Sequence, residues 1–540
     1  MGMYVNPGNA GFKKISGSNY IDKTMLISLI NERINAEKNL ICVSRPRRFG
    51  KSYAAKMLTA YYDCSCDSHS LFDDKKIAAC DSYTKHLNQY NVINLDITGF
   101  ISLAQRKGIA LREVPDKIAD AVKEEVLALD PTLSADKDLE NTLTKYVGKE
   151  GNKKFIFIID EWDAMIREAK DDPEAQKRYL NLLRGWFKNG NFTDQVVAAA
   201  YMTGILPIKK DGSQSAISDF KEYTMIKPLE FGGYVGFTEE EVMSICEKKN
   251  ADFDMMKKWY DGYSFKNVGS VYNPNSVMNA ISNDDFDSYW TETSAAEGLL
   301  EYISQDYNGL TKTIAELIGG VDVKVSTTGF ANDLTTFRGK DDVLTLMIHL
   351  GYLAYDSVNE TVRIPNEEIK KEFSKAVKQV NHRATLDRLR ESEQLFLDTI
   401  NGNEEAVASQ IEKIHREETA PLHYNKEDSL RSVIKLAYYS YRDHYVQFEE
   451  LAAGEGFADV VYLPKYDSDY PILVIELKWN KNAEGAITQI LNKKYPDALK
   501  NFDTKILLVG ISYEKDSADN SKKHTCRIIE YYPDYETKDL

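Results

Sequence analysis

Four short runs of apolar residues, separated by longer amphipathic stretches, constrain the fold of the first 235 residues more than any other feature. Each run is short and apolar over most of its length, which is typical of strands buried on both faces of a sheet. The stretches between the runs show helical patterns, and alternating strands and helices predict an α/β domain with a mainly parallel sheet. The four runs are residues 39–43, 91–95, 154–159 and 196–201.

Length and composition exclude several classes of protein. The chain has 540 residues, which suggests three or four domains at roughly 150 residues each. A hydrophobic content of 43% is too high for a disordered chain, and no apolar run approaches the ~18 residues of a membrane span. Residues 1–13 lack a secretory signal pattern, and six cysteines are too few for a disulfide framework. We therefore expect a cytoplasmic protein with no membrane partner.

The remainder of the chain divides into two further regions. Helical patterns dominate from about residue 236, where Thr238 and the three glutamates after it indicate a helix N-terminus. A helix followed by a small hairpin at 343–364 suggests a winged-helix-like element, and the charged helical stretch 384–420 suggests a connector. A second α/β unit follows. The predicted domains are 1–235, 236–420 and 421–540.

The first apolar run leads into a candidate phosphate-binding loop. A strand, a loop, Gly-Lys-Ser and a helix form the context of a P-loop, in which backbone N–H groups surround phosphates. Lys51 would reach the terminal phosphates of ATP, and the Ser52 hydroxyl would ligate Mg²⁺. Arg45 stands where the generic pattern has its first glycine, and a basic surface turn is the alternative interpretation. The residues expected to bind ATP here are Arg48, Phe49, Gly50, Lys51 and Ser52.

The third apolar run ends in two carboxylates, as a Walker-B strand does. Asp160 would help to bind ATP by holding Mg²⁺ through water, and Glu161 would polarise the attacking water. Asp163 could support either residue. A solvated acidic turn is the alternative, but the upstream Gly-Lys-Ser favours a nucleotide site.

Two other polar residues near this site have both a functional and a structural interpretation. Thr203 ends the fourth apolar run and could sense the γ-phosphate of ATP, although a threonine at a strand end is often structural. Arg184 could act as an arginine finger, but an ordinary arginine on a helix surface explains it more simply. We include Thr203, and not Arg184, in the predicted ATP site.

A second group of charged residues lies near the C-terminus. Residues 457–463 and 471–479 are predicted as neighbouring strands, and alternation places Glu476 and Lys478 on one face. Asp459 can lie beside them in a hairpin. Two carboxylates can bind Mg²⁺, and an adjacent lysine can orient water. Gln489 lies in a helical segment that could cover the site, and Glu427 could supply a further carboxylate to the metal.

The alternative for this group is an exposed strand edge that happens to carry charges. Glu476, however, lies within Ile-Leu-Val-Ile-Glu-Leu, and a carboxylate in so apolar a run needs a partner. The sequence therefore favours a metal site with Asp459 and Glu476 as ligands.

The two sites, in this order, resemble those of a bacterial family with an N-terminal AAA-like ATPase domain and a C-terminal PD-(D/E)xK nuclease domain. The resemblance covers nearly the whole chain. The family's loop has the form Arg-Pro-Arg-Arg-Phe-Gly-Lys-Ser, as at 45–52, so the absent glycine belongs to its pattern. Asp459, Glu476-Leu477-Lys478 and Gln489 align with the nuclease signature. The other matching segments are 20–24, 160–163, 203–206, 236–242, 259–263 and 272–274.

The resemblance implies an ATPase coupled to Mg²⁺-dependent cleavage of nucleic acid, DNA in preference to RNA, in a chain that could form homo-oligomers. The implied catalytic residues are Glu161, Asp459, Glu476, Lys478 and Gln489.

One alternative is a nucleotide-dependent switch or scaffold whose nuclease-like domain only binds nucleic acid or a protein partner. Whether Asp459, Glu476 and Lys478 converge on one pocket would distinguish the nuclease from the switch or scaffold. A third possibility is an ATPase motor in which Glu476 is buried and paired structurally. A net charge of −16 excludes a uniformly basic nucleic-acid coat but permits a local basic channel.

Overall fold

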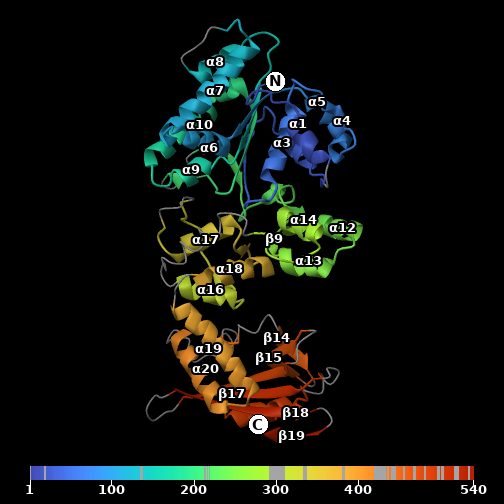
Figure 1. The fold of residues 1–540 in the computed structure, drawn as a ribbon, viewed down its shortest axis with the longest axis vertical. Helices are drawn as coiled ribbons and strands as arrows, with labels where there is room; N and C mark the ends of the chain where they lie inside the picture. The colour runs from blue at the N-terminus through green and yellow to red at the C-terminus, as the bar shows by residue number, and fades with distance from the viewer. Residues whose placement is uncertain are drawn as a thin grey trace. The chain divides into compact units, whose positions relative to one another are not determined.

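The computed structural model divides the chain into two compact units, each of which is described by itself (Figure 1). The first unit contains Met1–Gly309 and Lys324–Phe373, and the second contains Leu310–Val323 and Ser374–Leu540. The structure describes residues 2–17, 20–133, 138–208, 210–211, 214–215, 217, 219–290, 310–331, 337–379, 383–418, 433–434, 437–438, 445–453, 456–465, 470–479, 482–495, 499, 504–515, 522–532 and 535–539.

A five-stranded sheet forms the centre of the first unit. Its order is β2-β3-β4-β1-β7, and every neighbouring pair is parallel. Its strands are β2 (Asn91–Asp96), β3 (Phe155–Asp160), β4 (Val197–Gly204), β1 (Leu40–Ser44) and β7 (Lys221–Tyr223). All four predicted apolar runs are therefore strands of one sheet. Because β4 lies between β1 and β3, the ends of the two strands that lead into the candidate ATP site are one strand apart.

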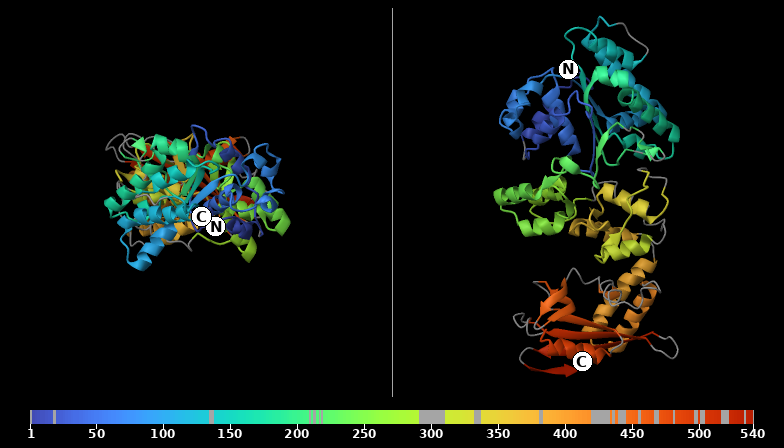
Figure 2. Two further views of the ribbon diagram at one scale, coloured as in Figure 1. Left: turned by 90° about the horizontal axis from the view of Figure 1, so that it is seen from above. Right: turned by 180° about the vertical axis from the view of Figure 1, so that it is seen from behind.

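Helices cover both faces of this sheet, which explains why its central strands β1, β3 and β4 are mainly apolar. The views in Figures 1 and 2 agree in placing one group of helices on one side and a second group on the other. The first group includes α1 (Ala10–Ser16) and α3 (Lys51–Tyr62), and the second α6 (Ile97–Lys107), α7 (Val114–Leu129), α8 (Leu139–Val147) and α10 (Pro173–Phe187). Strand residues such as Ile93, Phe157 and Met202 share one hydrophobic core with α6, α7, α8 and α10.

The middle of the chain is mainly helical, as predicted. Thr238 caps α12 (Glu239–Lys249) in a capping box with Glu241. The helices α13 (Phe253–Tyr260) and α14 (Pro274–Asn283) follow, together with a small antiparallel sheet of β8 (Phe237–Thr238), β10 (Gly269–Tyr272) and β9 (Tyr263–Phe265). The helix and hairpin expected at 343–364 are α17 (Lys340–Leu350), β12 (Ala354–Asp356) and β13 (Thr361–Arg363). The helix α18 (Glu367–Gln379) comes next.

The second unit contains a six-stranded mixed sheet of order β14-β15-β16-β17-β18-β19. Only β16 and β17 are parallel neighbours. The strands are β14 (Tyr445–Ala453), β15 (Gly456–Pro464), β16 (Ile472–Trp479), β17 (Ile506–Lys515), β18 (Lys522–Tyr532) and β19 (Tyr535–Asp539). This is the predicted C-terminal α/β unit.

Both faces of this sheet are covered. Leu473 and Ile475 of β16 share a core with α19 (Arg383–Ile400) and α20 (Glu404–Glu418), and the intervening Val474 belongs to a second core with α22 (Ala483–Asn492). The charged stretch interpreted as a connector therefore contains helices that pack on the C-terminal sheet. Their apolar residues form a narrow stripe, which gives a weak signal of burial in a charged sequence. No helix in the described ranges is long and apolar enough to cross a membrane.

A buried carboxyl group joins α18 to α14 in the first unit. The Oε1 atom of Glu368 accepts hydrogen bonds from Ser276 Oγ and from the backbone N–H of Tyr289, both at 2.9 Å. Glu368 is only 1% exposed, and this burial raises its pKa to about 7. The folded chain thus keeps a proton on Glu368 in a pH range where the unfolded chain has lost it.

This difference predicts that the stability of the first unit falls as the pH rises from about 4.5 to about 7. Glu368→Gln should remove this pH-dependent loss, because the amide is neutral and its oxygen can accept the hydrogen bonds from Ser276 and Tyr289. The cost of facing the amide NH2 group to the Trp290 backbone N–H limits the gain. At about pH 8 the urea midpoint should rise by the equivalent of roughly 3 kcal/mol or less, with little change near pH 4.5. Glu367→Gln, on the more exposed preceding residue, is the control. An unchanged midpoint of Glu368→Gln at about pH 8 would contradict the prediction.

Candidate functional sites

The loop between β1 and α3 has the backbone geometry of a tight turn into a helix. Gly50 directly precedes α3 with a φ of 94°, a conformation that glycine adopts without the strain of a side chain. Lys51, the first residue of the helix, is only 4% exposed. Its Nζ atom donates to the carbonyl oxygen of Pro46 at 2.9 Å, and lies 3.4 Å from Oε1 of Glu161. The loop therefore holds a buried ammonium group at the helix N-terminus.

Arg45, which replaces the usual first glycine, has a packing role. Its side chain is fully buried, and Nη1 donates to the carbonyl oxygens of Ser44 at 2.8 Å and Tyr223 at 3.2 Å. The guanidinium lies 5.2 Å from the centre of the Phe265 ring, a cation–π distance. Arg45 thus connects the loop to β7 and β9, and burial lowers its pKa to about 10.

A cavity of about 470 Å³ opens beside this loop. We call it the nucleotide cavity. All five predicted loop residues line it, together with Glu161. The opposite wall comes from segments far away in the sequence, and its residues include Tyr20, Ile21, Lys23, Tyr234, Gly236, Phe237, Pro274, Asn275 and Met278. Three of these segments carry motifs of the family resemblance, but sequence reasoning gave them no place in a site.

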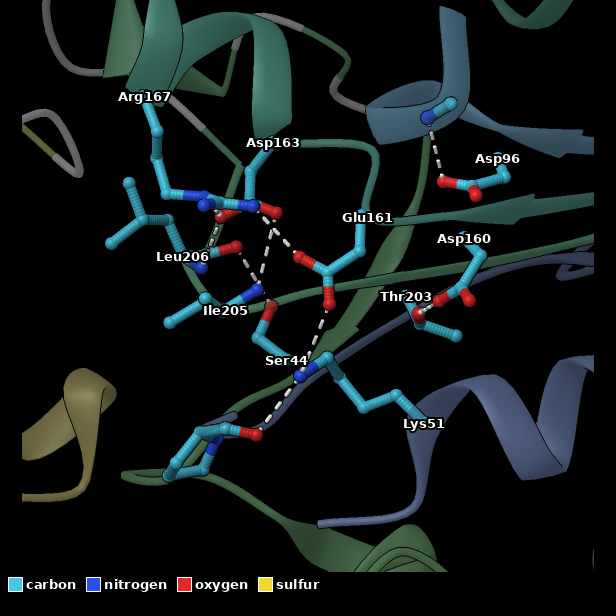
Figure 3. Close-up of polar contacts among 12 residues, drawn as sticks. Ser44, Lys51, Asp96, Asp160, Glu161, Asp163, Arg167, Thr203, Ile205 and Leu206 are labelled. Atoms are coloured by element: carbon cyan, nitrogen blue, oxygen red, sulfur yellow. Dashed lines mark hydrogen bonds and ion pairs between the residues drawn. The ribbon is translucent and has the colours of Figure 1, made fainter. Parts of the chain in front are cut away.

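Asp160 and Thr203 lie at the ends of β3 and β4, beside the loop but outside the lining of the nucleotide cavity. Thr203 Oγ1 donates to Asp160 Oδ1 at 2.6 Å (Figure 3). The structure thus brings the predicted sensor to the predicted metal-binding carboxylate. Arg184 donates to Asn181 of its own helix at 3.1 Å, as a surface arginine would.

Glu161 lies between two cations that contact its carboxylate, and Arg47 adds a third positive charge nearby. Its Oε1 atom faces Lys51, and its Oε2 atom accepts from Arg167 Nη2 at 2.7 Å (Figure 3). Its backbone φ of 53° is uncommon for a non-glycine residue. Burial raises the pKa of Glu161, and the charge of Lys51 opposes that shift. Sequence reasoning missed Arg167, whose only signal was its position four residues after Asp163.

The C-terminal residues predicted on β15, β16 and α22 converge on one site, which we call the carboxylate cluster. The backbone N–H of Leu477 donates to Asp459 Oδ2 at 2.8 Å. Lys478 Nζ lies 2.8 Å from Oε1 of Glu476, and Gln489 Nε2 donates to the same oxygen. Glu427 falls outside the described residues.

Glu476 has one carboxylate oxygen that the described part of the protein leaves without a hydrogen-bond partner. This atom is the buried Oε2, and the residue as a whole is 2% exposed. Burial raises the pKa of Glu476 to about 7; the hydrogen bond from Lys478 opposes this shift, and the charge of Asp459 adds to it. A buried oxygen without a partner is costly, and carboxylate oxygens are the ligands that Mg²⁺ takes. The residues present therefore fit a Mg²⁺ ion.

The close packing of α22 against β17 positions Gln489. Gly510 is the register partner of Glu476, and a Cβ atom added to it would lie 2.6 Å from the Ala483 carbonyl oxygen. A glycine is therefore needed for the helix to approach the sheet so closely. Tyr495 is buried behind the cluster and hydrogen-bonds to Gln489. No sequence signal marked Tyr495, because its place depends on how the chain turns after α22.

Two family models match this chain. Residues 8–213 match a predicted AAA-ATPase family, and residues 425–522 match the PD-(D/E)XK nuclease superfamily. The chain therefore combines an AAA-ATPase-like domain with a domain of the PD-(D/E)XK nuclease superfamily. The architecture that the sequence motifs indicated is confirmed.

The chain is also similar to individual proteins, with low sequence identity. An Azotobacter chroococcum mcd 1 protein, described as an uncharacterized protein in the vnfD 5′ region, is 22% identical over 376 residues. The match covers 66% of this chain and 66% of the Azotobacter protein, which is just under two thirds of the length of that relative. A solved replication initiator DnaA, bound to AMPPCP and single-stranded DNA, is 10% identical, with 69% of this chain and 88% of that chain covered and a TM-score of 0.26. The Aeropyrum pernix ORC2 protein is 13% identical, with 68% and 98% covered and a TM-score of 0.29.

The packing at Gly510 gives a test of the carboxylate cluster. Gly510→Ala should push α22 away from β17, destabilise the second unit by about 1–3 kcal/mol, and weaken Mg²⁺ binding by displacing Gln489. Urea denaturation and isothermal titration with Mg²⁺ measure the two effects. Gly485→Ala, within α22 itself, is the control, because an added Cβ there meets only Asn482 Oδ1, at 3.2 Å. If Gly510→Ala binds Mg²⁺ with the same affinity as the wild type, the packing of α22 does not contribute to the carboxylate cluster.

Proposed function

We propose that this protein binds and hydrolyses ATP and cleaves phosphodiester bonds of nucleic acid, DNA in preference to RNA, in a Mg²⁺-dependent reaction. The predicted domain 1–235 carries the first activity and the predicted domain 421–540 the second, with region 236–420 between them. One observation supports cleavage above all others. The buried Oε2 atom of Glu476 has no hydrogen-bond partner in the described chain, while Lys478 and Gln489 both bind the other oxygen, Oε1, and the charge of Asp459 lies close enough to raise the pKa of Glu476. This oxygen is what distinguishes the cluster from a purely structural ion pair.

In the ATP site, each residue has a role that follows from its position. Lys51 and the backbone of residues 48–50 bind the phosphates, since the buried ammonium and the helix N-terminus both attract anions. The Ser52 hydroxyl and Asp160 would hold Mg²⁺, which neutralises phosphate charge when it is bound. Glu161 orients the attacking water, and Thr203 holds the Asp160 carboxylate.

In the carboxylate cluster, Asp459 and Glu476 would hold Mg²⁺, which lowers the pKa of a bound water and neutralises the phosphodiester. Lys478 places a positive charge beside Glu476, where an attacking water would be oriented. Gln489 fixes the rotamer of Glu476 through its amide. The low water accessibility of Glu476 strengthens each of these electrostatic interactions.

The two walls of the nucleotide cavity support a role for the middle region as a nucleotide sensor. A nucleotide that fills the cavity would touch the loop and also Phe237, Pro274 and Met278. These residues belong to or flank β8 and α14, so nucleotide binding would bias the position of these elements.

The first test separates binding of ATP from its hydrolysis. Lys51→Ala should weaken ATP binding more than tenfold, because the phosphates lose their buried cation. Glu161→Gln should bind ATP normally and lose hydrolysis by about a hundredfold, because only water activation is affected. Fluorescent-nucleotide binding and phosphate release measure the two quantities. Lys56→Ala, on an exposed lysine of the same helix, is the control. Wild-type ATP affinity in Lys51→Ala would refute the assignment of the loop.

The second test concerns cleavage. Asp459→Ala should lose Mg²⁺ binding and cleavage together, whereas Lys478→Met should keep the metal and lose about a hundredfold or more in rate. Labelled duplex and single-stranded DNA and RNA, with and without ATP and Mg²⁺, are the substrates. Lys523→Met, on an exposed residue of β18, is the control. Binding of nucleic acid without cleavage by the wild type would favour the alternative function, a nucleotide-dependent switch or scaffold.

A further inference from the structure

Arg167, on the short helix α9 (Ala164–Glu168), bridges two carboxylates of the Walker-B segment. Its Nη2 atom donates to Glu161 Oε2 at 2.7 Å, and its Nε atom donates to Asp163 Oδ2 at 3.0 Å. The side chain is only 12% exposed, so water screens these contacts weakly. Two neighbouring N–H groups along one edge of the rigid guanidinium thus hold two acidic residues in a fixed relation.

Asp163 is an immobile anchor for this bridge. It is fully buried, and its two oxygens accept hydrogen bonds from the backbone N–H groups of Ile205 at 3.2 Å and Leu206 at 2.9 Å (Figure 3). Gly204 packs so closely that an added Cβ atom would lie 2.6 Å from Asp163 Oδ1. The guanidinium is therefore fixed relative to the end of β4.

The two oxygens of Glu161 have different partners. Oε1 faces Lys51 at 3.4 Å and Oε2 faces Arg167 at 2.7 Å. Phosphates in the nucleotide cavity would attract Lys51, which lines that cavity, whereas Arg167 is absent from its lining. Oε1 would then lose its cation and become available to a water molecule, while Oε2 stays bound.

Glu161 also needs support against its own backbone. A φ of 53° is disfavoured for a residue with a side chain and costs of order 1 kcal/mol or more. Surrounding contacts must hold the residue in this conformation, and the 2.7 Å hydrogen bond from Arg167 is one of those contacts.

We propose that Arg167 is a positioning residue for ATP hydrolysis, which holds Oε2 of Glu161 so that Oε1 points toward the attacking water. The proposal rests on the proposed ATPase function. Arg167 does not touch the nucleotide in this scheme and acts only through Glu161.

The test compares Arg167→Met and Arg167→Lys with the wild type in single-turnover ATP hydrolysis. Arg167→Met should lower the hydrolysis rate about tenfold to a hundredfold and leave the Kd for ATP within about threefold. Arg167→Lys should retain an intermediate rate, because an ammonium can hold Oε2 but cannot also span to Asp163. Arg178→Met is the matched control, since Arg178 lies on α10 in an exposed pair with Asp116.

A double-mutant cycle then distinguishes positioning from a general structural role. In a Glu161→Gln background, Arg167→Met should change the residual rate by less than about twofold, because the carboxylate on which it acts is already gone. An equal fractional loss in both backgrounds, or loss of ATP binding in both Arg167 variants, would show a structural role and overturn the proposal. A faster rate in Arg167→Met would also overturn it.

Failure of the proposed ATPase function would give a different result from failure of the positioning role. The proposed ATPase function requires that the wild type releases phosphate from ATP and that Lys51→Ala abolishes this release. If the wild type releases no phosphate, or if Lys51→Ala releases it equally fast, the ATPase function fails and the role of Arg167 fails with it. If the wild type hydrolyses ATP and Arg167→Met does so equally fast, only the positioning role fails.

Discussion

The hydrogen bonds that join the carboxyl ends of β1, β3 and β4 are the constraint on which the candidate nucleotide site depends. The N–H of Arg45, after β1, donates to the carbonyl oxygen of Gly204 at 3.0 Å, and the N–H of Trp162, after β3, donates to that of Thr203 at 2.8 Å. The end of β4 therefore fixes the loop that precedes α3 on one side and the segment that follows β3 on the other. Lys51 and Glu161 approach each other because their two strands share this neighbour.

The carboxylate cluster depends on a different physical effect, the desolvation of a carboxylate within a hydrophobic sheet. Neighbours of Glu476 along β16, such as Ile475 and Leu477, belong to the core beneath α19 and α20. The opposite face of the strand is apolar as well and lies beneath α22. Glu476 is therefore only 2% exposed, and its carboxylate is stabilised by the positive charge of Lys478 and the hydrogen bond from Gln489. The same burial that makes the free carboxylate costly makes the site suited to a cation.

Much of this arrangement could be predicted from the sequence, because it depends on local patterns. The apolar runs predicted the strands, and the polar residues after them predicted which side chains meet at the sheet edge. Strand alternation predicted the proximity of Glu476 and Lys478. These inferences need only the geometry of strands and the chemistry of the residue types.

The remainder depends on tertiary contacts that no local pattern reveals. The strand order places β4 between β1 and β3, and only that order brings Arg167 and Asp163 to the end of β4. The far wall of the nucleotide cavity joins Tyr20 to Met278 through chain folding. Tyr495 and the packing of α19 and α20 on the C-terminal sheet are likewise results of long-range contacts.

The composition of that cavity wall has a consequence for the lifetime of the protein. If a nucleotide binds this cavity as proposed, it would contact the loop, residues 20–23 and residues 274–278 and so act as a removable cross-link between three distant stretches of one chain. At a hundredfold excess over its Kd, such a ligand stabilises the folded form by about 2.7 kcal/mol. Proteases that attack opened chains would therefore degrade the empty protein faster than the loaded one.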